Sequence, residues 1–342
     1  MTVTERVVVP APAGPSETVR PVAAQKALAV ETVGLRKEFG QRVAVANLSI
    51  AVPEGEVFGF LGPNGAGKST TVKMLVGLVR PTSGSGTLFG RPLGDARARR
   101  HLGFLPEQFR FHEWLRAEEF LDFHASLYGV PKRARPRRIA EVLALIGLES
   151  RAQDALRTFS KGMLQRIGIG QALLADPRLV ILDEPTSALD PIGRRDVRDL
   201  IRTLRERGVA VFLNSHLLSE VEMVCDRVAI IDRGRVVRQG SMAELVSGTL
   251  EVEVRVEGAS PDLLARLEQR WPRVTRVAEA TAAPDGVAQP GIQTVRFALD
   301  DDADVARIAD AVVRDGARLH ALVPHHTTLE DLFVQTVEKR EV

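Results

Sequence analysis

The stretch that decides the fold reads Gly62-Pro63-Asn64-Gly65-Ala66-Gly67-Lys68-Ser69-Thr70. An apolar run at residues 57–61 precedes it, and a segment of helical character at residues 71–76 follows it. Strand, glycine-rich loop and helix in this order are what a phosphate-binding P-loop requires. Glycines allow successive backbone N–H groups to turn inward around an anion, and the helix that starts near Lys68 points its positive dipole end at the same anion. The sequence therefore predicts a nucleoside triphosphate site.

Two side chains of this loop have the chemistry that bound phosphates need. Lys68 is expected to reach the β- and γ-phosphates, and the hydroxyl of Ser69 is expected to ligate Mg²⁺. The loop residues predicted to bind the nucleotide are Gly62, Pro63, Asn64, Gly65, Ala66, Gly67, Lys68, Ser69 and Thr70.

Composition limits the class of protein. The chain has 342 residues, which is enough for two domains, and its 44% hydrophobic and 26% charged residues are typical of globular proteins. The 46 Lys and Arg residues nearly match the 44 Asp and Glu residues, so no electrostatic argument favours nucleic acid as the main partner. The single cysteine, Cys225, excludes a disulfide within this sequence and indicates a reducing compartment.

We expect no membrane-spanning segment and no signal peptide. No apolar stretch approaches the roughly 20 residues that cross a bilayer. The N-terminus has an acid, Glu5, near its start and lacks a sustained apolar region, unlike a signal peptide. A membrane role would therefore come through a partner.

Sequence patterns divide the chain into a tail and two domains. Residues 1–27 are rich in Pro, Ala and Val and predict a disordered tail. Residues 28–247 predict an α/β core with a helical insertion at about 106–175. Continuous apolar runs, typical of parallel strands covered by helices on both faces, lie at 179–182, 209–213 and 227–231.

The last part of the chain, 248–342, predicts a smaller α+β domain. Strands and helices follow one another there in the order βαββαβ, which is that of a ferredoxin-like split unit. A linker rich in Pro and Gly lies at 282–291, and a final helical segment spans 329–339. We find no catalytic set in this domain and expect it to serve dimerisation or regulation.

Two acids end the apolar strand at 179–182. Asp183 at a strand terminus can hold Mg²⁺, directly or through water, and Glu184 can orient or deprotonate an attacking water. A solvated pair of acids at a strand end is the bland alternative, and the P-loop upstream argues against it.

Two further polar positions fit a nucleotide site. Ser160 opens a helix, where it suits either an ordinary N-cap or an anion site that faces a second nucleotide. His216 follows an apolar strand within Asn214-Ser215-His216 and could bond the γ-phosphate, although a lone histidine is more often structural.

Together these motifs resemble the ATP-binding-cassette (ABC) ATPases, over about residues 30–245. The resemblance implies a P-loop ABC ATPase fold, ATP with Mg²⁺ as cofactors, and ATP hydrolysis coupled to transport. It makes Gly62 to Thr70 the Walker A motif and Leu179 to Asp183 the Walker B motif. Glu184 becomes the catalytic glutamate and His216 the switch histidine. The segment Ser187 to Asp190 becomes the D-loop, so that Asp190 joins the nucleotide-binding residues.

The resemblance also implies partners and a location. Two copies would form a head-to-tail homodimer, and each ATP would touch the P-loop of one copy and the Ser160 segment of the other. The homodimer would drive a separately encoded integral membrane permease from the cytoplasmic face of the membrane. Phe39 matches the aromatic residue that stacks on adenine, with a core strand aromatic as the alternative.

Two positions depart from the common family pattern. The signature motif reads Phe159-Ser160-Lys161-Gly162-Met163, so Ser160 and Gly162 are kept for the phosphate contact while Lys161 replaces a glycine. In the Q-loop, Glu107 stands where glutamine is usual and Gln108 follows it. Either residue could approach Mg²⁺ or the water, and the sequence does not choose between them.

The direction of transport rests on resemblance alone. The Ser-Lys-Gly-Met signature, residues 215–220 and residues 328–333 look like those of bacterial exporter ATPases. An importer ATPase with a substrate-sensing C-terminal domain is the alternative. A cassette acting on ribosomes or DNA fits less well, because this chain has neither a second cassette nor a long heptad run.

Two segments of the helical insertion allow more than one interpretation. Residues 109–115 are rich in large side chains and either meet the membrane subunit, as in the family, or form the core of the insertion. Residues 131–138 are basic and form either a solvated loop and first helical turn or a contact with anionic lipid headgroups.

Overall fold

The fold is described from a computed structural model. It describes residues 26–187, 189–246, 250–271, 274–277, 292–299, 301, 303–325 and 328–338. Nearly all of the predicted tail, residues 1–25, and the predicted linker at 282–291 lie outside the described residues.

The described strands of the first domain form one ten-stranded sheet in the order β5-β4-β1-β2-β10-β9-β3-β8-β7-β6. Strands β3, β8, β7 and β6 run parallel, and every residue of β3, β7 and β8 is buried. This burial explains their uninterrupted apolar sequences. The strands span Leu28–Phe39 (β1), Arg42–Pro53 (β2), Val57–Leu61 (β3), Ser83–Leu88 (β4), Arg91–Pro92 (β5), Leu102–Leu105 (β6), Leu179–Asp183 (β7), Ala210–Asn214 (β8), Arg227–Asp232 (β9) and Arg235–Ser241 (β10).

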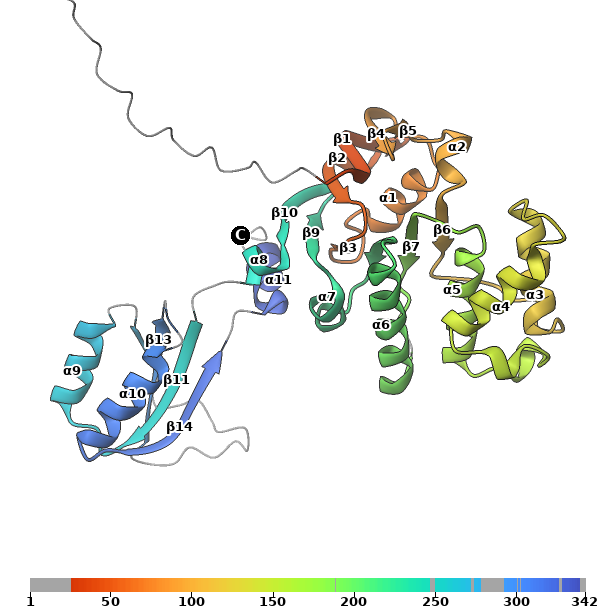
Figure 1. Cartoon of the computed structure of the whole chain (residues 1–342). Helices are drawn as coiled ribbons and strands as arrows, with labels where there is room; N and C mark the ends of the chain where they lie inside the picture. The colour runs from red at the N-terminus through yellow and green to blue at the C-terminus, as the bar shows by residue number, and fades with distance from the viewer. Residues whose placement is uncertain are drawn as a thin grey trace, which may run out of the picture.

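Helices cover both faces of this sheet (Figure 1). They span Lys68–Leu75 (α1), Ala96–Arg99 (α2), Ala117–Leu127 (α3), Arg135–Leu145 (α4), Lys161–Leu173 (α5), Pro191–Glu206 (α6), Leu218–Val224 (α7) and Met242–Val246 (α8), with short 3₁₀ turns at Glu149–Arg151 and Leu156–Thr158. Alternate residues of β7 enter different cores. Val180 and Leu182 join the core of α5, α6 and α7, whereas Leu179 and Ile181 join the core of α1 and the β1–β2 ribbon.

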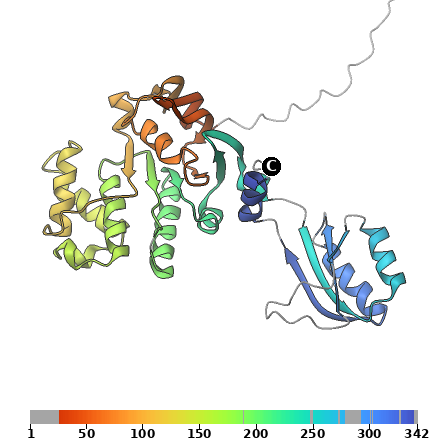
Figure 2. The same ribbon diagram turned by 180° about the vertical axis from the view of Figure 1, so that it is seen from behind.

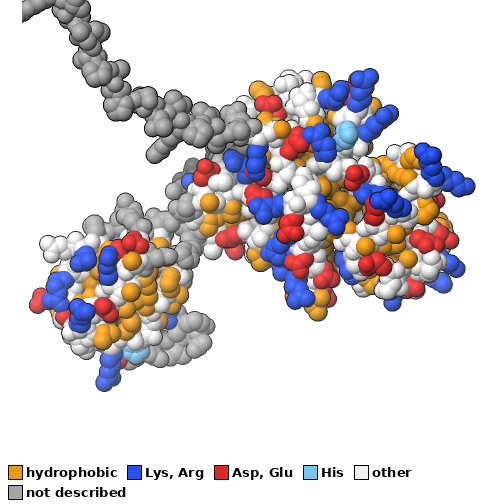
Figure 3. Space-filling view, viewed as in Figure 1, with side chains coloured by type: hydrophobic (Ala, Val, Ile, Leu, Met, Phe, Trp, Pro, Cys, Tyr) orange, Lys and Arg blue, Asp and Glu red, His pale blue; other side chains and the backbone are white. Residues whose placement is uncertain are grey.

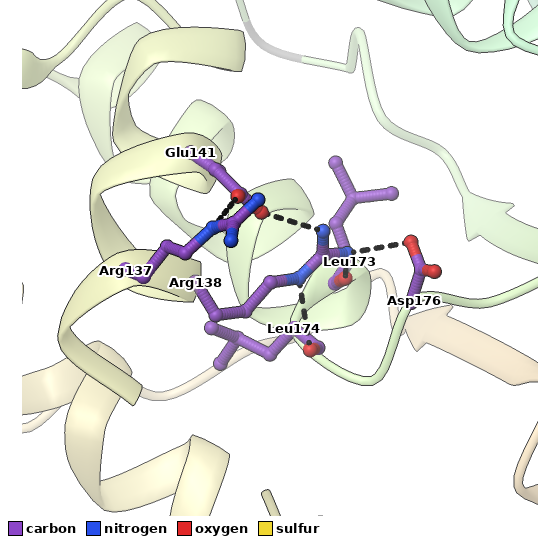
Figure 4. A network of polar contacts seen from close by, with 6 residues as sticks. All are labelled: Arg137, Arg138, Glu141, Leu173, Leu174 and Asp176. Carbon is purple, nitrogen blue, oxygen red and sulfur yellow. Dashed lines mark hydrogen bonds and ion pairs between the residues drawn. The ribbon is translucent and has the colours of Figure 1, made fainter. Parts of the chain in front are cut away.

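The helical insertion is α3, α4 and α5, and an arginine of α4 holds the end of α5 (Figure 4). Arg138 donates from Nη2 to the carbonyl of Leu173 at 2.6 Å and from Nε to that of Leu174 at 3.2 Å. Its guanidinium also pairs with Asp176 at 3.0 Å, and Arg137 and Arg138 both bond Glu141. The last carbonyls of a helix have no intrahelical partner, so Arg138 satisfies groups that the helix leaves unpaired. This part of the basic run is structural.

The second domain has four described strands in the order β12-β13-β11-β14, with every pairing antiparallel. Helices α9 and α10 pack on it through a core that includes Val252, Leu263, Phe297 and Ile308. This is the predicted βαββαβ order. The elements span Leu250–Glu257 (β11), Pro261–Arg270 (α9), Val274–Val277 (β12), Ile292–Leu299 (β13), Ala303–Arg314 (α10) and Arg318–His325 (β14).

The last described helix, α11 (Leu329–Glu338), packs on the first domain, and this departs from the sequence assignment to the accessory domain. It contacts α7 and α8, and Figures 1 and 2 both show it beside α8. Leu329 and Leu332 are buried in the core that contains Val221 and Leu245. The backbone N–H of Leu329 donates to Glu222 Oε2 at 3.3 Å. The helix that follows the accessory domain in the chain is therefore anchored to the first domain.

We expect Leu329→Ala to destabilise the first domain. Its side chain is fully buried, so the truncation removes apolar contacts and leaves a cavity that costs about 2–4 kcal/mol. Val334→Ala is the matched control because Val334 lies on the same helix and is 42% exposed. Urea unfolding followed by fluorescence measures both variants. Equal midpoints for Leu329→Ala and Val334→Ala would contradict the docking of α11.

Candidate functional site

The P-loop passes two other strands so closely that Gly62 and Gly67 have no room for a side chain. A Cβ atom on Gly62 would lie 2.4 Å from the carbonyl oxygen of Ile231, at the end of β9. A Cβ atom on Gly67 would lie 2.5 Å from the carbonyl oxygen of Ala44, and Gly67 has a φ of +105°. The loop borders a cavity of about 180 Å³, lined by Arg42, Val43, Ala44, Pro63, Asn64, Gly65, Gly67, Lys68, Ser69 and Thr70.

Lys68 is the charged side chain of this loop. Its Nζ donates to the carbonyl oxygens of Gly62 at 2.6 Å and Pro63 at 3.2 Å. Burial lowers the pKa of the Lys68 ammonium, and the carboxylates of Glu184 and Asp183 oppose that shift. The lysine is thus held inside the phosphate loop by backbone oxygens while it faces the two acids of the β7 end.

Asp183 lies at the carboxyl end of β7, where the neighbouring parallel strand β8 ends with Asn214. Asn214 Nδ2 donates to Asp183 Oδ1, and the two side chains are 1% and 7% exposed. Burial raises the pKa of Asp183, and the nearby carboxylates of Glu107 and Glu184 raise it further. The sequence did not mark Asn214 as a site residue. The available signal was a polar residue that ends an apolar strand beside the strand of Asp183.

The oxygen donors around Asp183 fit Mg²⁺. Asp183, Glu107 and the hydroxyl of Ser69 are hard oxygen groups, and a desolvated carboxylate flanked by further acids gains most from a nearby cation. Within the described residues, no group of three or more His, Cys, Asp or Glu side chains could hold a metal by itself. This suits Mg²⁺, which is usually held by one or two carboxylates together with substrate phosphates.

Glu184 points toward the histidine of the next loop. It has a φ of +53°, which is unusual for a residue with a side chain, and its N–H donates to the carbonyl of Asn214 at 2.8 Å. Glu184 Oε2 then lies 2.7 Å from His216 Nδ1. The strained backbone turns the carboxylate away from the strand and toward His216. The structure therefore brings two of the three predicted catalytic side chains, Glu184 and His216, into contact, while the third, Lys68, bonds the P-loop backbone.

Ser160 and Asp190 cap helices in this chain. Ser160 Oγ accepts from the N–H of Met163 at 3.3 Å at the start of α5, and Asp190 Oδ1 accepts from the N–H of Gly193 at 2.7 Å at the start of α6. A Cβ atom on Gly162 would lie 3.8 Å from Gly193, so the two helix starts lie close together. Of the described residues, neither capping side chain lines the P-loop cavity. Ser160 and Asp190 thus form a second cluster of predicted site residues, at the starts of two neighbouring helices.

Phe39 and the Q-loop residues lie at the edge of the site. Phe39 is 51% exposed, so it is not the core aromatic that was the alternative. It pairs across the β1–β2 ribbon with Arg42, which lines the P-loop cavity. Glu107 is exposed, yet the negative charge of its carboxylate acts to raise the pKa of both Lys68 and Asp183. Gln108 is exposed beside it.

Comparison with known proteins decides the family. The ABC transporter profile matches residues 45–187. An uncharacterized ABC transporter ATP-binding protein of Synechocystis sp. is 40% identical over 297 residues, which cover 86% of this chain and 78% of that protein. The chain belongs to the ABC transporter ATP-binding proteins. The predicted fold class and ATPase activity are thereby confirmed at the level of the family.

Two further similarities concern this ABC ATPase. The linearmycin resistance ATP-binding protein LnrL of Bacillus subtilis is 38% identical over 243 residues, which cover 70% of this chain and 78% of that protein. A dimeric ATP-binding cassette in a post-hydrolysis state, bound to ADP and Pi, matches with a TM-score of 0.56 at 27% identity, covering 62% of this chain and 98% of that one. The roles of individual site residues stay predictions.

Phe39→Ala is expected to weaken ATP binding to this ABC ATPase. Loss of base stacking costs about 1–3 kcal/mol, which is roughly 5- to 150-fold in affinity. Phe39→Tyr keeps a stacking ring and should bind as the parent does. Titration with a fluorescent ATP analogue measures both variants. Unchanged affinity in Phe39→Ala would remove Phe39 from the adenine site.

Proposed function

We propose that this chain powers an exporter as a head-to-tail homodimer, which closes on two ATP molecules and drives a separately encoded membrane permease. The observation that carries the proposal is the exposed helix start at Ser160. Ser160 is exposed at the start of α5 and lies outside the lining of its own P-loop cavity. A helix start with free N–H groups suits an anion. We propose that this anion is a phosphate of the nucleotide that a second copy binds. The dimeric cassette found among the structural relatives supports this arrangement.

Hydrolysis would use the side chains gathered at the ends of β7 and β8. Glu184 would orient the attacking water or accept a proton from it. His216 would bond both Glu184 and the γ-phosphate and so fix their relative positions. Lys68 stabilises the charge on the phosphoryl oxygens. Mg²⁺ held by Ser69 and Asp183, with Glu107 nearby, would neutralise phosphate charge. Loss of the shared γ-phosphate would then weaken the dimer and let it open.

Glu184→Gln should trap a dimer bound to ATP. The amide cannot take the proton, while the phosphate contacts that join two copies remain. We expect turnover to fall by at least a hundredfold, by the loss of general base catalysis, and sedimentation velocity to show a dimer in ATP but not in ADP. Glu244→Gln, an exposed acid remote from β7, is the control. A Glu184→Gln protein that hydrolyses ATP normally would remove Glu184 from this role.

Ser160→Glu should abolish turnover without affecting the affinity of the single copy for ATP. The carboxylate would repel the γ-phosphate bound by the other copy. The P-loop cavity of the same copy would remain intact, because Ser160 does not line it. Ser160→Thr keeps the cap and is the control. Steady-state ATPase assays and nucleotide titration separate the two effects, and unchanged turnover in Ser160→Glu would count against a shared site.

Export is favoured over import by the signature motif and by one relative. The motif Ser160-Lys161-Gly162-Met163 resembles that of bacterial exporter ATPases, and LnrL is named for resistance to linearmycin. Removal of a compound from the cell is one route to resistance. The transported substrate would contact chiefly the permease.

One structural feature supports the importer alternative. A groove of about 730 Å³ runs between α9 and α10 of the accessory domain, and Figure 3 shows hydrophobic side chains between arginines on that face. Its lining includes Leu263, Leu267, Ala311, Arg266 and Arg314. A transported compound that binds this groove in calorimetry would favour an importer with a substrate-sensing domain.

The membrane partner is proposed to meet the exposed part of the segment at 109–115. Phe109 and Phe111 pack against each other and the core of the insertion, with ring centroids 4.8 Å apart, whereas Trp114 is 74% exposed. No helix in the described part of the chain is long and apolar enough to span a membrane. We place the protein at the cytoplasmic face of the membrane through this contact. Purification of the native complex would identify the permease.

A further inference from the structure

An ion pair joins α6 and α7, the helices that precede and follow β8 in the chain. Glu220 of α7 accepts with both carboxylate oxygens from Arg198 Nη1 of α6, each at 2.8 Å. The side chains of Arg198 and Glu220 are 18% and 9% exposed. Glu220 lies four residues after His216, within the same short segment that follows β8.

The pair is a poor way to stabilise the fold. Removing both charges from water is costly, and buried ion pairs can often be replaced by apolar side chains with no loss of stability. Arg198 Nε is also buried and, within the described residues, has no hydrogen-bond partner. A device of this kind is better suited to setting the position of one helix against another.

The start of α7 is not fixed by a side-chain cap. The helix is 7 residues long, and Leu217 at its N-cap makes no side-chain capping bond. In the loop that carries His216, the N–H of Leu217 donates to Ser215 Oγ at 3.1 Å. His216 itself is 55% exposed at its side chain, so packing does not fix it. The place of α7 relative to α6 therefore decides where the imidazole lies.

We propose that Glu220 and Arg198 are positioning residues for ATP hydrolysis, which hold α7 so that His216 Nδ1 stays within 2.7 Å of Glu184 Oε2. Neither residue is among those that line the P-loop cavity. The inference rests on the roles proposed above for Glu184 and His216.

The first test removes the charge of one partner. Glu220→Gln should lower kcat for ATP about tenfold and leave KM within twofold, because the P-loop cavity is not lined by Glu220. The matched control is Arg205→Gln. It breaks the ion pair between Arg205 of α6 and Asp226, which lies two residues after the end of α7. This control should keep the parent kcat.

The second test separates positioning from stability. The double variant Arg198→Met with Glu220→Leu should keep the parent melting temperature, since it replaces a buried ion pair with apolar groups, and should still lose kcat. The exchanged pair Arg198→Glu with Glu220→Arg should recover kcat relative to either single exchange. A parent-like kcat in the apolar double variant would overturn the proposal, and so would an exchanged pair no better than the single exchanges.

A third variant tells failure of this inference from failure of the proposed function. His216→Ala should lose turnover if His216 acts as proposed. If His216→Ala is inactive but Glu220→Gln has the parent kcat, the positioning role is refuted and the proposed function stands. If His216→Ala turns over normally, the proposed function loses its histidine and the positioning role fails with it.

Discussion

The electrostatic attraction between Lys68 and the carboxylates of Asp183 and Glu184 is the interaction on which the rest of this structure depends. Burial disfavours the charged forms of Lys68 and Asp183, and the attraction between the ammonium and the carboxylates offsets part of that cost. Phosphates and a divalent cation would add the missing charge partners. The parallel strands β3, β7 and β8 make this possible, because their carboxyl ends meet at one edge of the sheet.

The same architecture places the second half of the site elsewhere. The insertion carries α5 on its own core, with Arg138 bonded to the last carbonyls of α5 and Ser160 capping its start. A rigid helix held at both ends presents its N–H groups at a defined position on the surface. In the proposed homodimer these N–H groups would complete the nucleotide site of the other copy, and hydrolysis would then depend on association as well as on ATP binding.

The accessory domain is tied to the cassette more closely than its sequence position indicates. Its strands and helices follow the expected ferredoxin-like order, yet α11 returns to pack against α7, the helix that follows His216. Helix α7 is therefore held on one side by Arg198 and on another by the end of the chain. Helix α11, which follows β14 of the accessory domain in the chain, thus contacts the helix that follows His216, the predicted switch histidine.

The sequence by itself determined the P-loop, the central strands and the acids that end β7, because glycine backbone freedom and continuous apolar runs act locally. It could not show that Asn214 bonds Asp183, that Glu220 meets Arg198, or that Leu329 enters the first core. Those contacts join residues far apart in the chain. Strand order and helix packing alone decide them, since no local pattern records which distant side chain will be the neighbour.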